Sequence, residues 1–154
     1  MRNIAVVGAV TALFATSAMT AGAASIASPN PCKAVAAGVI TTALGGAATG
    51  KLTSQNANGS KLSICTYTRA AVKLEVEIGP KAIASGGFGG PHGMKVKADA
   101  ALGPDGKLFY DTSPKYTFAN ATFTKGSFFG EVWSNKLPIA KVIPVAKSLY
   151  AALQ

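Results

Sequence analysis

The sequence has little charge, few acids and few of the residues that most often carry catalysis. Of its 154 residues, 14% are charged, with 6 acids against 15 lysines and arginines, and it holds one histidine and two cysteines. A disordered chain combines low hydrophobicity with high charge, whereas 49% of these residues are hydrophobic. No collagen-like or simple repeat is present. We therefore expect one globular domain.

The N-terminal segment predicts a secretory signal. Arg2 provides a positive charge, and residues 4–18 form an uncharged run rich in alanine and valine. The small-x-small pattern that ends at Ala23 favours cleavage there, with cleavage after Ala27 as the second choice. A transmembrane anchor needs about 20 apolar residues, and this run is shorter. The segment at 1–23 is thus expected to direct secretion.

The chain that remains after cleavage is strongly basic. Removing 23 residues, including Arg2, leaves 131 residues with a net charge of +8. Residues 24–30 are expected to form a flexible leader and 31–154 a single domain without a later membrane span. Cys32 follows Ser-Pro-Asn-Pro, which is not a lipid-attachment box. The sequence therefore predicts a secreted protein, extracellular or periplasmic.

Cys32 and Cys65 are expected to form a disulfide. An exported chain meets an oxidising compartment, in which an even pair of cysteines normally closes. A redox site would need a CxxC motif, and a zinc site would need clustered cysteine and histidine ligands. Neither pattern occurs. We predict one structural bridge and no metal site.

Hydrophobic periodicity predicts a helix, a run of strands and a closing helix. The first helix begins at Asn30-Pro31, a cap followed by proline, and ends at Gly45-Gly46. The last covers 137–153. Strands are expected at 62–67, 72–78, 94–99, 107–110, 116–125 and 127–134, with long loops at 46–60 and 79–93. This order predicts an α+β domain with an antiparallel sheet of about six strands and both helices packed on one face.

The strand at 72–78 alternates apolar and charged residues. Because one face of an antiparallel strand often meets water, we interpret its charged residues, Lys73, Glu75 and Glu77, as a solvated face and not as a carboxylate pair.

The order of these features resembles the exported domains of unknown function found in actinobacterial envelopes. The resemblance rests on the Asn30-Pro31-Cys32 start, the helix running into 43–45, the strand at 65–67 and the alanine-rich end at 149–153. It implies ligand or envelope binding at most, and it supplies no catalytic residues. The chain lacks the lipid-attachment cysteine of many such proteins, so membrane tethering does not carry over.

The motifs for catalysis and cofactor binding are weak. His92 stands alone, and no G-x-S-x-G elbow accompanies it. The glycine-rich segment 85–93 lacks the spacing of a phosphate-binding loop. Asp99, Asp105 and Asp111 are six residues apart, whereas a calcium loop places its ligands two apart. We predict no catalytic residue, no metal site and no cofactor.

The positive charge and the aromatic residues suggest a binding surface. Nucleic acid is disfavoured because Arg69 would be the single arginine after cleavage and the lysines are scattered. Such a charge suits an anionic envelope polymer, a lipid headgroup or an extracellular protein, or it serves solubility alone. If helices cover one sheet face, either Phe129 and Trp133 or the pair Phe128 and Val132 must face a cleft, a loop or solvent. A core on both faces is the simpler alternative.

The residues selected for a ligand or partner surface are Lys95, Lys97, Phe129, Trp133 and His92. The leading hypothesis is a small, secreted, non-enzymatic binding domain that associates with the cell envelope or an anionic extracellular partner. The alternative is a secreted inhibitor or effector that acts on another protein through an exposed loop. An enzyme is the third hypothesis.

Overall fold

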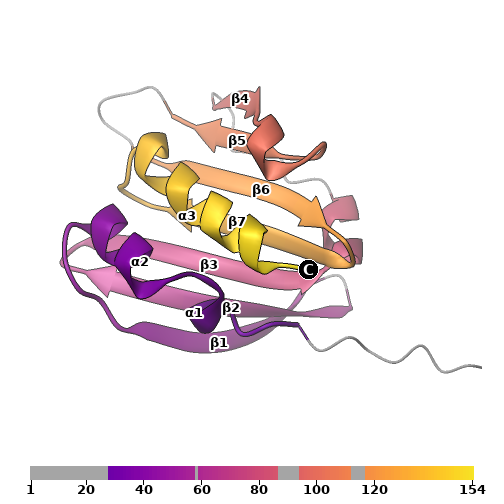
Figure 1. Cartoon of the computed structure of the whole chain (residues 1–154), viewed down its shortest axis with the longest axis horizontal. Coiled ribbons are helices and arrows are strands. Elements are labelled where there is room, and N and C mark those ends of the chain that lie inside the picture. Colours follow the sequence, from indigo (N-terminus) through magenta and orange to yellow (C-terminus); the bar gives the residue numbers. More distant parts are fainter. Residues whose placement is uncertain (1–27, 58, 87–93, 112–116) are drawn as a thin grey trace, which may run out of the picture.

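A seven-stranded antiparallel sheet carries three α-helices on one face in the computed structural model (Figure 1). The structure describes residues 28–57, 59–86, 94–111 and 117–154. The predicted signal segment and most of the leader lie outside these residues. The helices are α1 (Pro31–Ala34), α2 (Ala37–Leu44) and α3 (Ile139–Ala152), and the short 3-10 helices are η1 (Lys81–Gly86) and η2 (Ala100–Leu102). The strands are β1 (Gly50–Ala57), β2 (Ser60–Arg69), β3 (Val72–Pro80), β4 (Lys95–Ala98), β5 (Lys107–Tyr110), β6 (Ala119–Lys125) and β7 (Phe128–Ser134).

The strand order is β1-β2-β3-β7-β6-β5-β4, so the sheet consists of two meanders that meet at β3 and β7. Within each meander, strands adjacent in the chain are adjacent in the sheet. At the junction, Glu77 of β3 lies opposite Glu131 of β7, and Val76 lies opposite Val132. This junction joins residues 48 to 60 positions apart in the sequence and forms the centre of the sheet.

The α+β class and the antiparallel sheet are confirmed, whereas the expected strand count of about six is corrected to seven. The additional strand, β1, lies within the segment 46–60 that we expected to be a loop. Its sequence, GKLTSQNA, is polar and lacks apolar alternation. It forms because its backbone pairs with β2 from Gly50↔Tyr67 to Ala57↔Ser60, so the pairing partner and not the side-chain pattern determines the strand.

The first helix is broken in two, although the sequence predicted a continuous helix to Gly45. Asn30 caps α1 through its side-chain oxygen, which accepts a hydrogen bond from the Cys32 backbone N–H at 2.9 Å. Val35 then adopts an extended conformation (φ −109°, ψ 131°) and is buried. Burying this side chain ends α1, and α2 begins two residues later and closes at Gly45 in the left-handed region (φ 71°).

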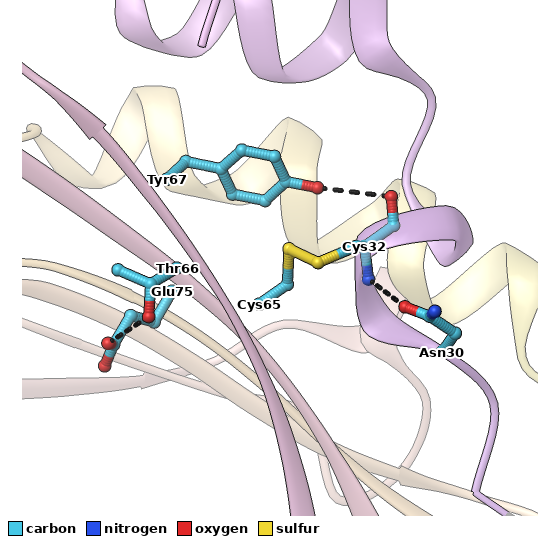
Figure 2. The surroundings of a disulfide bond; sticks show 6 residues. All are labelled: Asn30, Cys32, Cys65, Thr66, Tyr67 and Glu75. Atoms are coloured by element: carbon cyan, nitrogen blue, oxygen red, sulfur yellow. Dashed lines mark hydrogen bonds between the residues drawn. A yellow bond between two sulfur atoms is a disulfide. The ribbon is translucent and has the colours of Figure 1, made fainter. Parts of the chain in front are cut away.

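The disulfide between Cys32 and Cys65 joins α1 to β2, as the sequence predicted (Figure 2). The two Cα atoms are 5.1 Å apart, within the usual range. Beside it, the hydroxyl of Tyr67 donates to the backbone carbonyl of Cys32 at 3.4 Å. Burial raises the pKa of Tyr67 above its usual value. The first helix is thus fixed to the sheet by a covalent bond and a side-chain hydrogen bond.

The main core lies between the helices and the sheet. Apolar side chains from β2, β3, β6 and β7 form one cluster with the helices, in which Val142, Val145 and Leu149 of α3 are fully buried. At the edge of this core, the rings of Phe123 and Tyr150 meet edge to face with centroids 5.2 Å apart. The predicted closing helix is confirmed. Within the described residues, no helix has the length and apolarity needed to cross a bilayer.

Candidate functional site

The sheet face opposite the α-helices, which we call the back face, carries the polar and aromatic residues of the central strands. Alternation places one set of side chains toward the helices and the other on the back face. Phe128 and Val132 belong to the main core, so Phe129 and Trp133 belong to the back face. There Phe129 packs with Leu62, Ile64 and Ile83 of η1 in a second, smaller apolar cluster.

Three carboxylates lie on the back face, and all are buried. Glu75, Glu77 and Glu131 expose only 8%, 6% and 7% of their surface. The expectation that Glu75 and Glu77 form a solvated face is therefore wrong. The expectation fails because β3 is an interior strand with β2 on one side and β7 on the other. Side chains of these neighbouring strands therefore cover the carboxylates and exclude solvent from them.

Each carboxylate has its own hydrogen-bond partner. Glu75 forms an ion pair with Lys73 at 2.8 Å and accepts a hydrogen bond from the Thr66 hydroxyl at 2.7 Å. Figure 2 shows Thr66 and Glu75 on the side of the sheet away from the disulfide. Glu77 accepts a hydrogen bond from the indole N–H of Trp133 at 3.0 Å. Glu131 accepts one from the Asn120 side-chain amide.

Burial makes the two facing acids weak. Desolvation raises the pKa of Glu77 to about 7; Glu75 adds to this rise, while the Trp133 hydrogen bond and Lys73 oppose it. Desolvation raises the pKa of Glu131 to about 8, with a further contribution from the charge of Glu77, while the Asn120 hydrogen bond opposes the rise. Both acids thus take up a proton near neutral pH, where ordinary glutamates are ionised.

Asn120 leaves one buried polar atom without a partner. Its Nδ2 donates to Glu131, while its Oδ1 is buried and accepts no hydrogen bond within the part of the chain that the structure describes. Because a buried unpaired acceptor costs free energy, Oδ1 favours a donor nearby. A protonated Glu131 carboxyl group would provide an O–H donor for this oxygen.

A cavity of about 590 Å³ opens on the back face next to the buried carboxylates. We call it the back-face pocket. Its charged and polar lining includes Lys81 of η1, Lys107 of β5 and Thr122 of β6, and its apolar lining includes Phe109 and Phe129. These elements converge because β5 pairs with β6 and η1 packs against β7. The pocket therefore combines two lysine side chains with three phenylalanine rings, since Phe123 also contributes to the lining.

One acid offsets part of the positive charge of the pocket. Asp105 lies in the lining and accepts a hydrogen bond from the Thr124 hydroxyl at 2.7 Å. Among the described residues, the charged members of the lining are thus two lysines and one aspartate, with a positive formal sum.

The residues predicted to form one surface are separated. Phe129 lines the back-face pocket, and Trp133 stacks on Phe118 with centroids 6.1 Å apart and lies below the ammonium of Lys73. Lys95 and Lys97 are exposed on β4, at the far end of the sheet order from β1. His92 lies outside the described residues. The four candidates that lie in the described residues therefore do not converge on one site.

The sequence patterns did not point to Glu131, Asn120, Lys81 or Lys107 as site residues. A signal for Glu131 was available, because a single acid stands within the apolar and aromatic stretch FFGEVWS. The others carry no local signal, since their neighbours are determined by strand pairing.

Two of the three aspartates weighed as calcium ligands have local structural roles. Asp99 caps η2 through a hydrogen bond from the Ala101 backbone N–H at 3.0 Å, and Asp105 holds Thr124. Across residues 28–57, 59–86, 94–111 and 117–154, no group of three or more acid, histidine or cysteine side chains is arranged to hold a metal ion.

Comparison with protein-family models, curated proteins and solved structures finds no significant match to this chain.

Proposed function

We propose that this protein is a secreted, non-enzymatic binding domain whose back-face pocket takes an anionic amphiphile, a molecule with one negatively charged group and an apolar chain. The observation that carries the proposal is the convergence of Lys81 and Lys107 with Phe109 and Phe129 around one cavity. Ammonium groups attract the anionic head, and the apolar part of the lining, in which Phe109 and Phe129 expose 5% and 1% of their surface, faces the chain.

The size and charge of the protein support this ligand class. Small-molecule pockets usually measure about 300–1,000 Å³, and the cavity of about 590 Å³ falls in that range. The chain has a formal net charge of +9, which raises the local concentration of anions around the molecule. Acidic lipids of an envelope and free fatty-acid-like molecules share this chemistry. Secretion and the disulfide would place the pocket where it meets such molecules.

The test uses decanesulfonate below its micelle concentration, because its sulfonate stays ionised at every working pH. Isothermal titration calorimetry on the disulfide-bonded protein is expected to show stoichiometric binding. Replacing both pocket lysines, K81A/K107A, is expected to weaken binding about tenfold or more. The matched control K33A/K147A removes two exposed lysines from α1 and α3, on the opposite face, and should leave affinity nearly unchanged. Equal losses in both variants would show non-specific attraction and refute the site.

The exposed strand β1 favours a second candidate, binding to another protein. β1 stands at one end of the sheet order, and residues 51–56 are all exposed, including Leu52 at 51%. An open strand of this kind can pair with an extended segment of a partner. A pull-down from the culture medium and envelope at low and high salt separates the two candidates. A stoichiometric protein partner that persists in high salt would favour the inhibitor or effector hypothesis.

A further inference from the structure

Two carboxylates face each other at the centre of the back face. Glu77 and Glu131 are directly opposed in the β3–β7 register, a position in which Cβ atoms are about 5 Å apart. Both side chains are more than nine-tenths buried. Two negative charges at this separation, removed from water, repel each other strongly, so one proton held by the pair lowers its energy.

The neighbouring strands do not offer the pair a free cation. The adjacent back-face residues on β2 and β6, Ile64 and Thr122, are uncharged. On β3 itself, Lys73 is engaged by Glu75 at 2.8 Å. Other described charged residues on or beside this face include Lys51 at the β1 edge, Lys81, Asp105 and Lys107 around the pocket, and Asp111, which follows β5 opposite Phe118. Proton uptake is therefore the route to neutrality that the described surroundings leave open.

Asn120 supplies an independent indication of this proton. Its Nδ2 already donates to Glu131, and its buried Oδ1 accepts no hydrogen bond within the described residues. An ionised Glu131 has no hydrogen to offer, whereas a neutral Glu131 has one. A carboxylic acid beside a primary amide can exchange two hydrogen bonds, and this pairing would satisfy the unpaired oxygen.

The acid pair lies in register with the back-face pocket. A continuous cross-strand row runs from Glu77 to Glu131, then to Thr122 and Lys107. Thr122 and Lys107 line the pocket. Since neighbouring strands are about 4.8 Å apart, the Glu131 position is about 10 Å from the Lys107 position. A charge on the pair thus acts on the same pocket as Lys107.

We propose that Glu77 and Glu131 share a proton at neutral pH and that losing it at alkaline pH weakens anion binding in the back-face pocket. This proposal rests on the proposed function, because it regulates that site. The raised pKa values of the two acids, about 7 and about 8, agree with it. Deprotonation adds negative charge next to the bound anion and within reach of Lys107. From Coulomb repulsion of the bound anion over about 10 Å, at an effective dielectric constant of about 35, we expect affinity to fall about fivefold.

The experiment measures decanesulfonate affinity by calorimetry at pH 6 and pH 9. The ligand keeps its charge over this range, and lysine side chains remain mostly protonated. The wild type is expected to bind about fivefold more weakly at pH 9. The variant E77Q/E131Q cannot ionise at these positions and should bind equally at both pH values. E75Q removes a carboxylate that raises the pKa of both acids and frees Lys73, so its loss of affinity should begin at a lower pH than in the wild type.

Trp133 provides a readout that needs no ligand. It is the only tryptophan of the chain, and its indole donates to Glu77. Its fluorescence is expected to change between pH 6 and pH 9 in the wild type and not in E77Q. If the double variant does not fold, the single variants E77Q and E131Q take its place, and each should reduce the pH dependence.

The outcomes separate the two proposals. Binding that weakens at pH 9 in the wild type but not in the glutamine variants supports the proton-sharing pair. Binding that is equal at both pH values, with no fluorescence transition, overturns it and leaves the pocket assignment standing. If decanesulfonate binds at neither pH, the proposed function is overturned, and with it the regulation of binding by the shared proton. This holds even if Trp133 fluorescence reports a protonation change of Glu77.

Discussion

Replacing Glu131 with glutamine is expected to stabilise the protein at alkaline pH and to change its stability little in acid. Burial raises the pKa of Glu131 from 4.5 to about 8 in the folded protein. The folded state therefore holds its proton more tightly than the unfolded state. The contribution of protonated Glu131 to the free energy of unfolding is fully present below about pH 4.5. It is lost as the pH rises through about 8.

The size of the effect follows from the pKa difference. Each unit of pKa corresponds to about 1.4 kcal/mol, so the wild type should lose about 3–5 kcal/mol from Glu131 between pH 4 and pH 9. Glutamine keeps an acceptor for the Asn120 amide and adds a donor for its unpaired oxygen, and it cannot ionise. The free energy of unfolding of E131Q, relative to wild type, should therefore be higher at pH 9 than at pH 4 by about that amount.

The assay is urea unfolding followed by circular dichroism at pH 4 and pH 9. Circular dichroism is preferred to fluorescence because Trp133 contacts Glu77. E75Q is the control. E75Q removes the partner of Lys73 and a negative charge near Glu131. Its increase in the free energy of unfolding at pH 9 should therefore be far smaller than that of E131Q. If E131Q changes stability equally at both pH values, Glu131 is not held neutral by burial, and the electrostatic argument for the back face fails.

Three further predictions concern the scaffold. Replacing Cys32 and Cys65 with alanine removes a bridge between residues that are 33 positions apart. Chain entropy predicts that the free energy of unfolding falls by about 3–4 kcal/mol, measured by urea unfolding against the oxidised wild type. The substitution G130A would overlap the buried ring of Phe123 and should lower the midpoint of thermal unfolding, with a cost of about 1–3 kcal/mol. Arg69 donates from Nη1 to the last carbonyl of α2 at 3.0 Å, so R69M should cost about 1 kcal/mol in urea unfolding, while K61M, on the same strand, should cost almost nothing.

Local signals in the sequence identified the start of the first helix, the closing helix and most of the hairpins. Asn30-Pro31 predicted the start of α1, and the apolar period after Leu137 predicted α3. Gly126, at φ 56°, turns the chain between β6 and β7 as expected. These features depend on a few adjacent residues, so one sequence is enough to find them.

The elements that the sequence did not predict depend on distant partners. β1 has no apolar alternation, and it is a strand because β2 offers it a backbone edge. The break after α1 depends on Val35 entering the core. In both cases the free energy comes from contacts across the chain, which outweigh local propensity.

The candidate site shows the same division. The sequence by itself determined the disulfide, because two cysteines allow one pairing, and it determined the basic charge and the division of Phe128 and Phe129 between the two faces. Tertiary structure alone decided which face each ring occupies. It also paired β3 with β7, which buries Glu77 against Glu131 and brings Lys81 beside Lys107. The physical reason is that alternation fixes which side chains share a face, whereas the neighbours across that face depend on strand order, and strand order is set by packing of the whole chain.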